Sequence, residues 1–219
     1  MKRIKLFLFA PAIAAAIFAS KVFADEKLPY QQDFEKAEVG KVPEDFMVLD
    51  GGFAVKEENG SKFLELPGAP LDSFAVQFGP AETDNLSVTA CITGSAKGRR
   101  FPVFGVGLNG VAGYKLQVSS AKNAIELFKD QDLKASAAYD WKSGVSINLR
   151  LQLRNTGQGA WKIEGKVWPK AGAEPEKWMI AADEKEQPQP GRPSVFGSPF
   201  AGTPIRFDDL KVERGKPER

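Results

Sequence analysis

Five side chains in the segment from Trp141 to Trp178 have the chemistry of a sugar-binding face. They offer one indole ring, two amides, one guanidinium and one ammonium group: Trp168, Asn148, Gln152, Arg150 and Lys166. The face of an indole ring stacks on the C–H groups of a sugar, while amides and cations bind its hydroxyls through hydrogen bonds. To act together, all five side chains must lie on the same side of the protein.

The spacing of these residues places them on one side of a predicted hairpin. Apolar and polar residues alternate through Val145–Arg154, and Trp161, Ile163 and Val167 continue the apolar set after a Gly-rich turn at 155–159. Strand side chains alternate between two faces, so the apolar set is expected in the core and the polar set outside. The sequence therefore predicts a long antiparallel hairpin with the candidate residues on its outer face.

Trp168 also has a purely structural interpretation. At the end of its strand the ring would pack beneath the loop Pro169–Pro175, against Trp178, and the charged residues of the same face would simply be solvated. The sequence leaves both interpretations open.

The residue composition excludes several kinds of catalysis. The chain has no histidine and a single cysteine, Cys91. Ser-His-Asp and Cys-His catalysis and metal sites built on imidazole are therefore excluded, and no intrachain disulfide can form. Cys91 lies within an apolar strand pattern and is expected to be structural.

The first 24 residues have the pattern of a signal peptide. Basic residues at positions 2, 3 and 5 precede an uncharged run from Leu6 to Ser20, and Val22-Phe-Ala24 provides the small residues of a cleavage site. The run is short for a membrane span. Cleavage before Asp25 predicts export, to the periplasm or by secretion, with no membrane span in the mature chain.

Removal of the signal changes the charge balance. It takes four basic residues and no acidic ones, which leaves 26 basic and 28 acidic residues and a net charge of −2 in residues 25–219. This balance gives no electrostatic reason to expect a nucleic-acid partner.

The rest of the chain predicts a single all-β domain, residues 25–219. About a dozen short strand patterns follow one another at the spacing typical of β-sandwiches and barrels, and none has helical periodicity. Residues 25–32 are expected to be a loose lead-in, and a first strand is predicted at Asp33–Glu35. The glycines and Pro102 of the segment Phe101–Leu108 indicate a bent or edge strand.

The order of these predicted strands resembles a known superfamily. Asp33-Phe-Glu35 opens the domain, Gly105–Leu108 and Gly113–Val118 form a meander with Ile125–Lys129, and Phe207–Val212 closes it after the long hairpin. Over about residues 31–213 this order resembles the concanavalin A-like lectin/glucanase superfamily, in its laminin-G-like and bacterial sugar-associated branches. The resemblance implies a jelly roll of two stacked antiparallel sheets. The superfamily includes lectins, carbohydrate-binding modules and polysaccharide hydrolases.

Four carboxylates form a candidate structural calcium site: Asp33, Glu35, Asp208 and Asp209. The first and last strands of a jelly roll often lie side by side, and calcium takes about six to eight oxygen ligands. Phe207 and Leu210 differ in parity, so burying both requires a bulge at Asp208-Asp209. Alternatively, the four are edge-strand acids that discourage pairing with other chains.

The retaining β-glucanases of the superfamily carry a strand motif Glu-x-Asp-x-x-Glu, whose carboxylates act as nucleophile and acid. Glu82 and Asp84 begin this pattern, but Ser87 stands where the acid should be. This departure argues against that mechanism, and Glu82 and Asp84 are expected to be turn residues.

Three functions are compatible with the sequence. The first is an exported, non-catalytic, lectin-like domain that binds a carbohydrate or another polymer of the cell envelope. The second is a glycoside-acting enzyme, a hydrolase or lyase, whose carboxylates the sequence does not identify. The third is a structural or protein-interaction module of the envelope, with an exported protein as its partner.

Overall fold

The computed structural model describes residues 27–68 and 72–215, so the predicted signal peptide, residues 1–24, lies outside the described residues. Within these ranges nearly all regular structure is β-strand, apart from the single-turn 3-10 helices η1 (Ser120–Lys122) and η2 (Phe200–Gly202). No helix in this part of the chain is long and apolar enough to cross a membrane.

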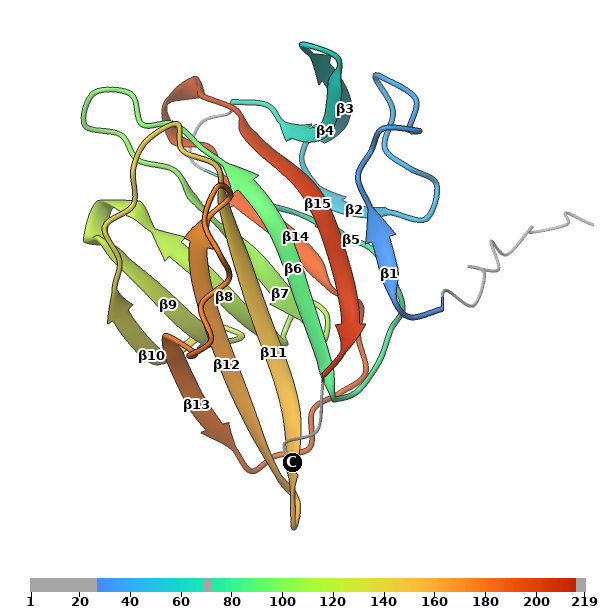
Figure 1. The fold of residues 1–219 in the computed structure, drawn as a ribbon, viewed down its shortest axis with the longest axis vertical. Coiled ribbons are helices and arrows are strands. Elements are labelled where there is room, and N and C mark those ends of the chain that lie inside the picture. The colour runs from blue at the N-terminus through green and yellow to red at the C-terminus, as the bar shows by residue number, and fades with distance from the viewer. Residues whose placement is uncertain (1–26, 69–71, 216–219) are drawn as a thin grey trace, which may run out of the picture.

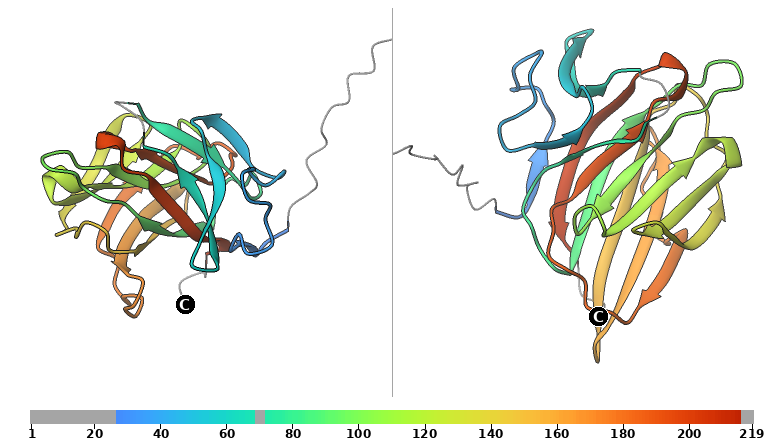
Figure 2. Two further views of the ribbon diagram at one scale, coloured as in Figure 1. Left: turned by 90° about the horizontal axis from the view of Figure 1, so that it is seen from above. Right: turned by 180° about the vertical axis from the view of Figure 1, so that it is seen from behind.

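The strands form two antiparallel sheets stacked face to face, as the sequence predicts (Figure 1). Sheet A has eight strands, ordered β13-β12-β11-β6-β15-β4-β3 with β1 also beside β15: β1 (Tyr30–Gln32), β3 (Ala54–Glu58), β4 (Ser61–Leu66), β6 (Leu86–Thr93), β11 (Ile147–Gly157), β12 (Ala160–Pro169), β13 (Ile180–Glu184) and β15 (Ile205–Arg214). Sheet B has seven, ordered β10-β9-β8-β7-β14-β5-β2: β2 (Met47–Asp50), β5 (Phe74–Gln77), β7 (Val103–Leu108), β8 (Tyr114–Ser119), β9 (Ala124–Lys129), β10 (Asp132–Ala138) and β14 (Ser194–Ser198). Figure 1 looks onto sheet A, and the right-hand view of Figure 2 shows sheet B from the opposite side.

The predicted hairpin is β11 and β12, and its apolar face lies in the core. Ile147, Leu149, Leu151 and Leu153 are each at most 1% exposed. Burying such a side chain contributes about 1.5–3 kcal/mol relative to leaving it in water. Val145 begins the predicted run but precedes the strand, and it is 42% exposed.

The N-terminal strand differs from the prediction. β1 lies at Tyr30–Gln32, within the predicted lead-in, and the predicted strand Asp33–Glu35 is a turn. Phe34 takes a left-handed φ of 58°, and the Gln32 side chain accepts a hydrogen bond from its N–H (2.8 Å). This turn ends the strand one residue before the position predicted for its start.

The bulge predicted near the C-terminus is present. The pairing of β15 with β6 shifts register between Asp208 and Lys211, and Asp209 has a φ of 50°. The shift allows both Phe207 (0% exposed) and Leu210 (1% exposed) to enter the core. The predicted side-by-side arrangement of the first and last strands is also confirmed, since β1 pairs with β15.

β7 is the fourth strand of sheet B, so the prediction of an edge strand is wrong. Pro102 precedes the strand, where it removes no ladder hydrogen bond. Gly105 and Gly107 alternate with the buried residues Phe104, Val106 and Leu108, which places both glycines on the outer face. At these two positions β7 therefore presents no side chain on that face.

Candidate functional site

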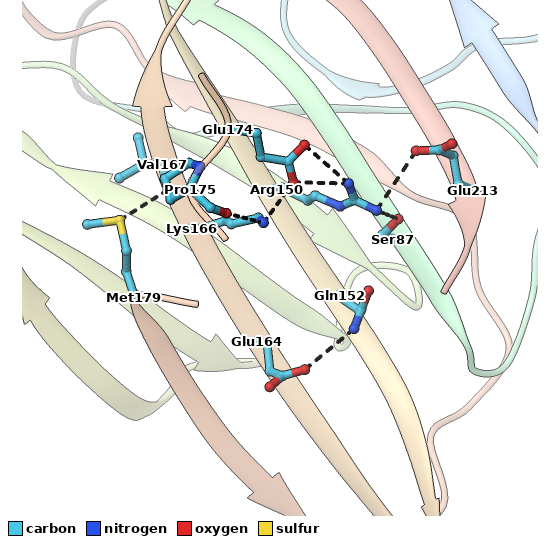
Figure 3. Close-up of polar contacts among 10 residues, drawn as sticks. All are labelled: Ser87, Arg150, Gln152, Glu164, Lys166, Val167, Glu174, Pro175, Met179 and Glu213. Atoms are coloured by element: carbon cyan, nitrogen blue, oxygen red, sulfur yellow. Dashed lines mark hydrogen bonds and ion pairs between the residues drawn. The ribbon is translucent and has the colours of Figure 1, made fainter. Parts of the chain in front are cut away.

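The five residues of the predicted binding face lie together on the outer face of sheet A. The register of β11 and β12 pairs Asn148 with Trp168. It also pairs Arg150 with Lys166 and Gln152 with Glu164, and Figure 3 shows these four side chains. This face is largely covered. Only 6–8% of Lys166, Gln152 and Trp168 is exposed.

Over Lys166 the cover is the connection from β12 to β13, residues 170–179, which we call the strap. The Lys166 ammonium donates to the Pro175 carbonyl (2.7 Å), lies 2.8 Å from the Glu174 carboxylate and sits 4.6 Å from the centre of the Trp178 ring. In the described chain, all partners of this ammonium come from the strap. Burial of the cation therefore depends on the strap being in place.

Arg150 holds the same carboxylate from the neighbouring strand. Its Nη1 is 3.1 Å from Glu174, and its Nη2 donates to the Ser87 hydroxyl (3.1 Å) and lies 3.9 Å from Glu213 (Figure 3). Partial burial of Glu174 opposes ionisation, but Lys166 and Arg150 outweigh it and lower the pKa of this carboxyl. Glu174 is therefore ionised and bound by the two cations Lys166 and Arg150.

Trp168 presents no open face to a ligand in this conformation, because it is only 8% exposed. Trp178, its expected neighbour, packs on Lys166 instead. Gln152 is also engaged, since its amide donates to Glu164 (3.4 Å), which Arg154 also contacts (3.3 Å).

Of the four carboxylates of the predicted calcium site, Asp33 and Asp209 line one open hollow, but Glu35 and Asp208 do not line it. Glu35 accepts a hydrogen bond from the Lys62 backbone on β4 (3.1 Å), whereas Asp208 and Asp209 pair with Lys170 (3.4 and 2.8 Å). Across residues 27–68 and 72–215, no three metal-ligating side chains come together. The predicted ligand set is not assembled, because these carboxylates serve separate local contacts.

Glu82 and Asp84 act as turn residues, as predicted. Glu82 pairs with Arg214 (3.0 Å), and Asp84 accepts a hydrogen bond from the Trp161 indole (2.9 Å). Cys91 is only 3% exposed, and burial raises the pKa of its thiol to about 11. Both properties favour the structural role expected for it.

An open groove of about 430 Å³ lies on the outer face of sheet B. Strand register aligns Gln77, Ser194, Gly107, Lys115 and Phe128 in a row across β5, β14, β7, β8 and β9. Because Gly107 has no side chain, the surface is depressed at the middle of this row, and the groove lies there. We call it the sheet B groove.

Three half-buried aromatic rings line the sheet B groove, from Phe74, Phe128 and Phe196. Phe196 lies against Gly105 on the neighbouring strand, since a Cβ built on that glycine would be 2.7 Å from the ring. Gln77, Lys115 and Asp130 also line the groove. Within the described chain these three side chains form no hydrogen bond or ion pair. Gln77 is only 5% exposed, whereas Lys115 is half-buried and Asp130 is exposed, so the polar groups of Lys115 and Asp130 are available to a ligand.

A buried carboxylate lies in the next row of sheet B. Glu126 faces Gln117 and is 3% exposed. Burial opposes its ionisation, but hydrogen bonds from Lys122, Ser119 and Gln117 outweigh this and lower the pKa of the carboxyl. The carboxylate of Glu126 is thus already bound by side chains of the protein.

No protein-family model and no curated protein matches the sequence. A structure reported for endo-acting O-glycanases of the human gut microbiota has a TM-score of 0.58 and 11% identity, over 85% of this chain and 99% of that chain. The carbohydrate-binding module CBM66 from Bacillus subtilis has a TM-score of 0.55 and 11% identity, over 77% of this chain and 95% of that one.

The exoplasmic/lumenal domain of VIP36, in its Ca2+/Man3GlcNAc-bound form, has a TM-score of 0.53 and 8% identity, over 82% of this chain and 87% of that one. At these identities the likenesses establish the fold alone. Together with the two stacked antiparallel sheets, they show that this chain adopts a jelly-roll β-sandwich fold.

Proposed function

We propose that this protein binds a carbohydrate in the sheet B groove. The observation that carries the proposal is the pairing of aromatic rings with unengaged polar groups in one open groove. Phe128 and Phe196 offer apolar faces to sugar C–H groups, and Lys115 and Asp130 offer hydrogen bonds to hydroxyls.

The fold neighbours support the choice of a carbohydrate over other polar ligands. One is described as a carbohydrate-binding module, and the VIP36 domain is described with Man3GlcNAc bound. The support is an analogy of fold, so the residues of the groove must carry the specificity.

The proposed binding occurs without turnover. Glycoside hydrolysis commonly requires a pair of carboxyl groups flanking the bond. Among the described residues that line the groove, Asp130 is the single carboxylate, and Glu126 in the neighbouring row is held by Ser119 and Lys122. These observations favour a binding module over a hydrolase.

We further propose that the protein acts outside the cytoplasm, in the periplasm or after secretion, with its signal removed before Asp25. N-terminal sequencing of the protein purified from its native cells tests this step. A mature chain that begins at Asp25 supports export, and an intact Met1 contradicts it.

A glycan screen followed by affinity measurements tests the groove. Residues 25–219 are screened on a glycan array, and the best glycan is titrated calorimetrically into the wild type, Phe196→Ala and Phe101→Ala. Phe101 is the matched control, because it is a 36% exposed ring outside the groove. Removing a central aromatic contact should weaken binding about tenfold or more, while the control binds like wild type.

Two results would contradict the proposal. One is a complete absence of binding across the array. The other is equal affinity of Phe196→Ala and wild type for the bound glycan. Release of a shortened glycan during the titration would instead favour the glycoside-acting alternative.

A further inference from the structure

Two cations lie side by side under the strap and contact a single carboxylate. Lys166 and Arg150 are paired across β12 and β11, and both contact Glu174 (Figure 3). The Lys166 side chain is only 8% exposed, although nothing in the sheet neutralises it: its described partners are all strap atoms. When all partners of a buried cation lie on one loop, that loop supplies the groups that neutralise the cation.

The strap itself has few apolar anchors. Its segment Lys170–Glu174 is exposed throughout, and Pro175 and Trp178 are only half-buried. Backbone hydrogen bonds hold its two ends, at Lys170 and Met179 (2.9 and 3.0 Å). A segment with so little buried apolar surface opens at a low free-energy cost relative to the core strands.

The surface beneath the strap can hold a carboxylate without Glu174. Arg150 presents a planar guanidinium suited to carboxylates, and its Nε is buried with no hydrogen-bond partner. Asn148 and Trp168 form the next pair on this face of β11 and β12, beside the pair of Arg150 and Lys166. Opening the strap would therefore place two cations beside an amide and an indole ring.

We propose that this face of sheet A is a second binding site, for the carboxylate of an acidic sugar, and that the strap closes it by inserting Glu174. The ligand displaces Glu174 from Arg150 and Lys166, and the strap lifts. The choice of a sugar as the carrier of the carboxylate rests on the function proposed for the sheet B groove. The site itself is separate, because the groove lies on the opposite sheet.

This arrangement makes a quantitative prediction about Glu174→Ala. A ligand that binds only the open form has an apparent affinity reduced by the fraction of open protein. Removing the competing carboxylate should therefore tighten binding of an acidic sugar by about tenfold or more. Glu176→Ala is the matched control, because it removes the same charge from an exposed strap residue without a described ion pair.

The experiment titrates trigalacturonic acid and its full methyl ester into the wild type and variants of residues 25–219. We expect Glu174→Ala to gain affinity for the acid but not for the ester, and Glu176→Ala to match the wild type. Adding Lys166→Met to Glu174→Ala should remove the gain. Adding Phe196→Ala should leave it, which separates this site from the sheet B groove.

An unchanged affinity of Glu174→Ala for trigalacturonic acid would overturn the proposal and leave Glu174 as a stabilising ion pair only. Hydrogen exchange on the wild type provides a second test that needs no variant. The proposal requires amides at 171–178 to exchange faster than those of β12. Equal protection of the two segments would contradict a displaceable strap.

Discussion

Replacing Gly105 by alanine tests why the sheet B groove exists. A Cβ at Gly105 would lie 2.1 Å from the carbonyl oxygen of Leu116 and 2.7 Å from the Phe196 ring. The first contact is with backbone of the neighbouring strand, which cannot rotate away. We expect β7 to shift against β8 and the ring to leave its position.

Gly107 provides the comparison on the same strand. A Cβ there would lie 2.5 Å from the Ser194 hydroxyl, which can rotate because it has no hydrogen-bond partner in the described chain. A forced rotamer costs about 0.5–1.5 kcal/mol. Replacing an unstrained glycine by alanine stabilises the folded protein by about 0.4–1 kcal/mol, because it lowers the conformational entropy of the unfolded chain. Gly107→Ala should therefore change the free energy of unfolding by less than about 1 kcal/mol.

For Gly105→Ala we expect a loss of about 2–3 kcal/mol, since overpacking against backbone cannot be relieved locally. For a domain of this size the loss corresponds to a fall in Tm of about 5–10 °C. Urea unfolding followed by tryptophan fluorescence and a thermal scan measures both variants. If Gly105→Ala were as stable as Gly107→Ala, the account of β7 as a strand packed closely by its neighbours would be refuted.

Three further predictions follow from single contacts. Asn109→Ala should lower the free energy of unfolding by about 2 kcal/mol in urea, because its side-chain amide, on a residue with a left-handed φ of 63°, donates to the carbonyls of Thr83 and Gln189 (2.7 and 2.8 Å); stability equal to wild type would contradict this. Cys91 should resist alkylation at pH 8 and react only in denaturant, because burial raises its pKa to about 11; fast labelling of the folded protein would disprove the burial. The carboxyl of Glu126 has its pKa lowered in the folded state, so its stabilisation is complete above its unfolded pKa near 4.5 and is lost as pH falls through the lower folded value; the urea midpoint of wild type should therefore fall more steeply below pH 4.5 than that of Glu126→Gln, and parallel curves would contradict it.

The sequence predicted those parts of the fold that depend on alternation. Ile147, Leu149, Leu151 and Leu153 enter the core because a period of two residues leaves no other arrangement for an antiparallel strand. The bulge at Asp208-Asp209 was predictable for the same reason, since Phe207 and Leu210 cannot otherwise both be buried.

The open groove could not be found in this way. Its floor lies where β7 has glycines, at positions 105 and 107, and therefore no side chains. Glycines at this spacing are also found in edge strands, so the local sequence does not distinguish the two cases. Only the pairing of β7 with β14 and β8 brings Phe196 and Lys115 beside those glycines. The signal available in the sequence was the alternation of glycine with Phe104, Val106 and Leu108.

The strap shows a second limit. Alternation placed Arg150, Lys166 and Trp168 on one face, and the structure puts them there. It could not reveal that Glu174 would fold back onto them, because the path of a loop rich in alanine, glycine and proline is set by tertiary contacts. The predicted calcium ligands failed to meet for a related reason: Lys170 of the same strap neutralises Asp208 and Asp209.

The most direct test of the central claim is to locate a bound glycan on the protein by NMR. Residues 25–219 are labelled with 15N, and the backbone amide shifts are followed during titration with the strongest glycan from the array. We expect the shifts to concentrate on β5, β14, β7 and β8, around the sheet B groove. Shifts confined to sheet A, or no glycan that binds at all, would contradict it.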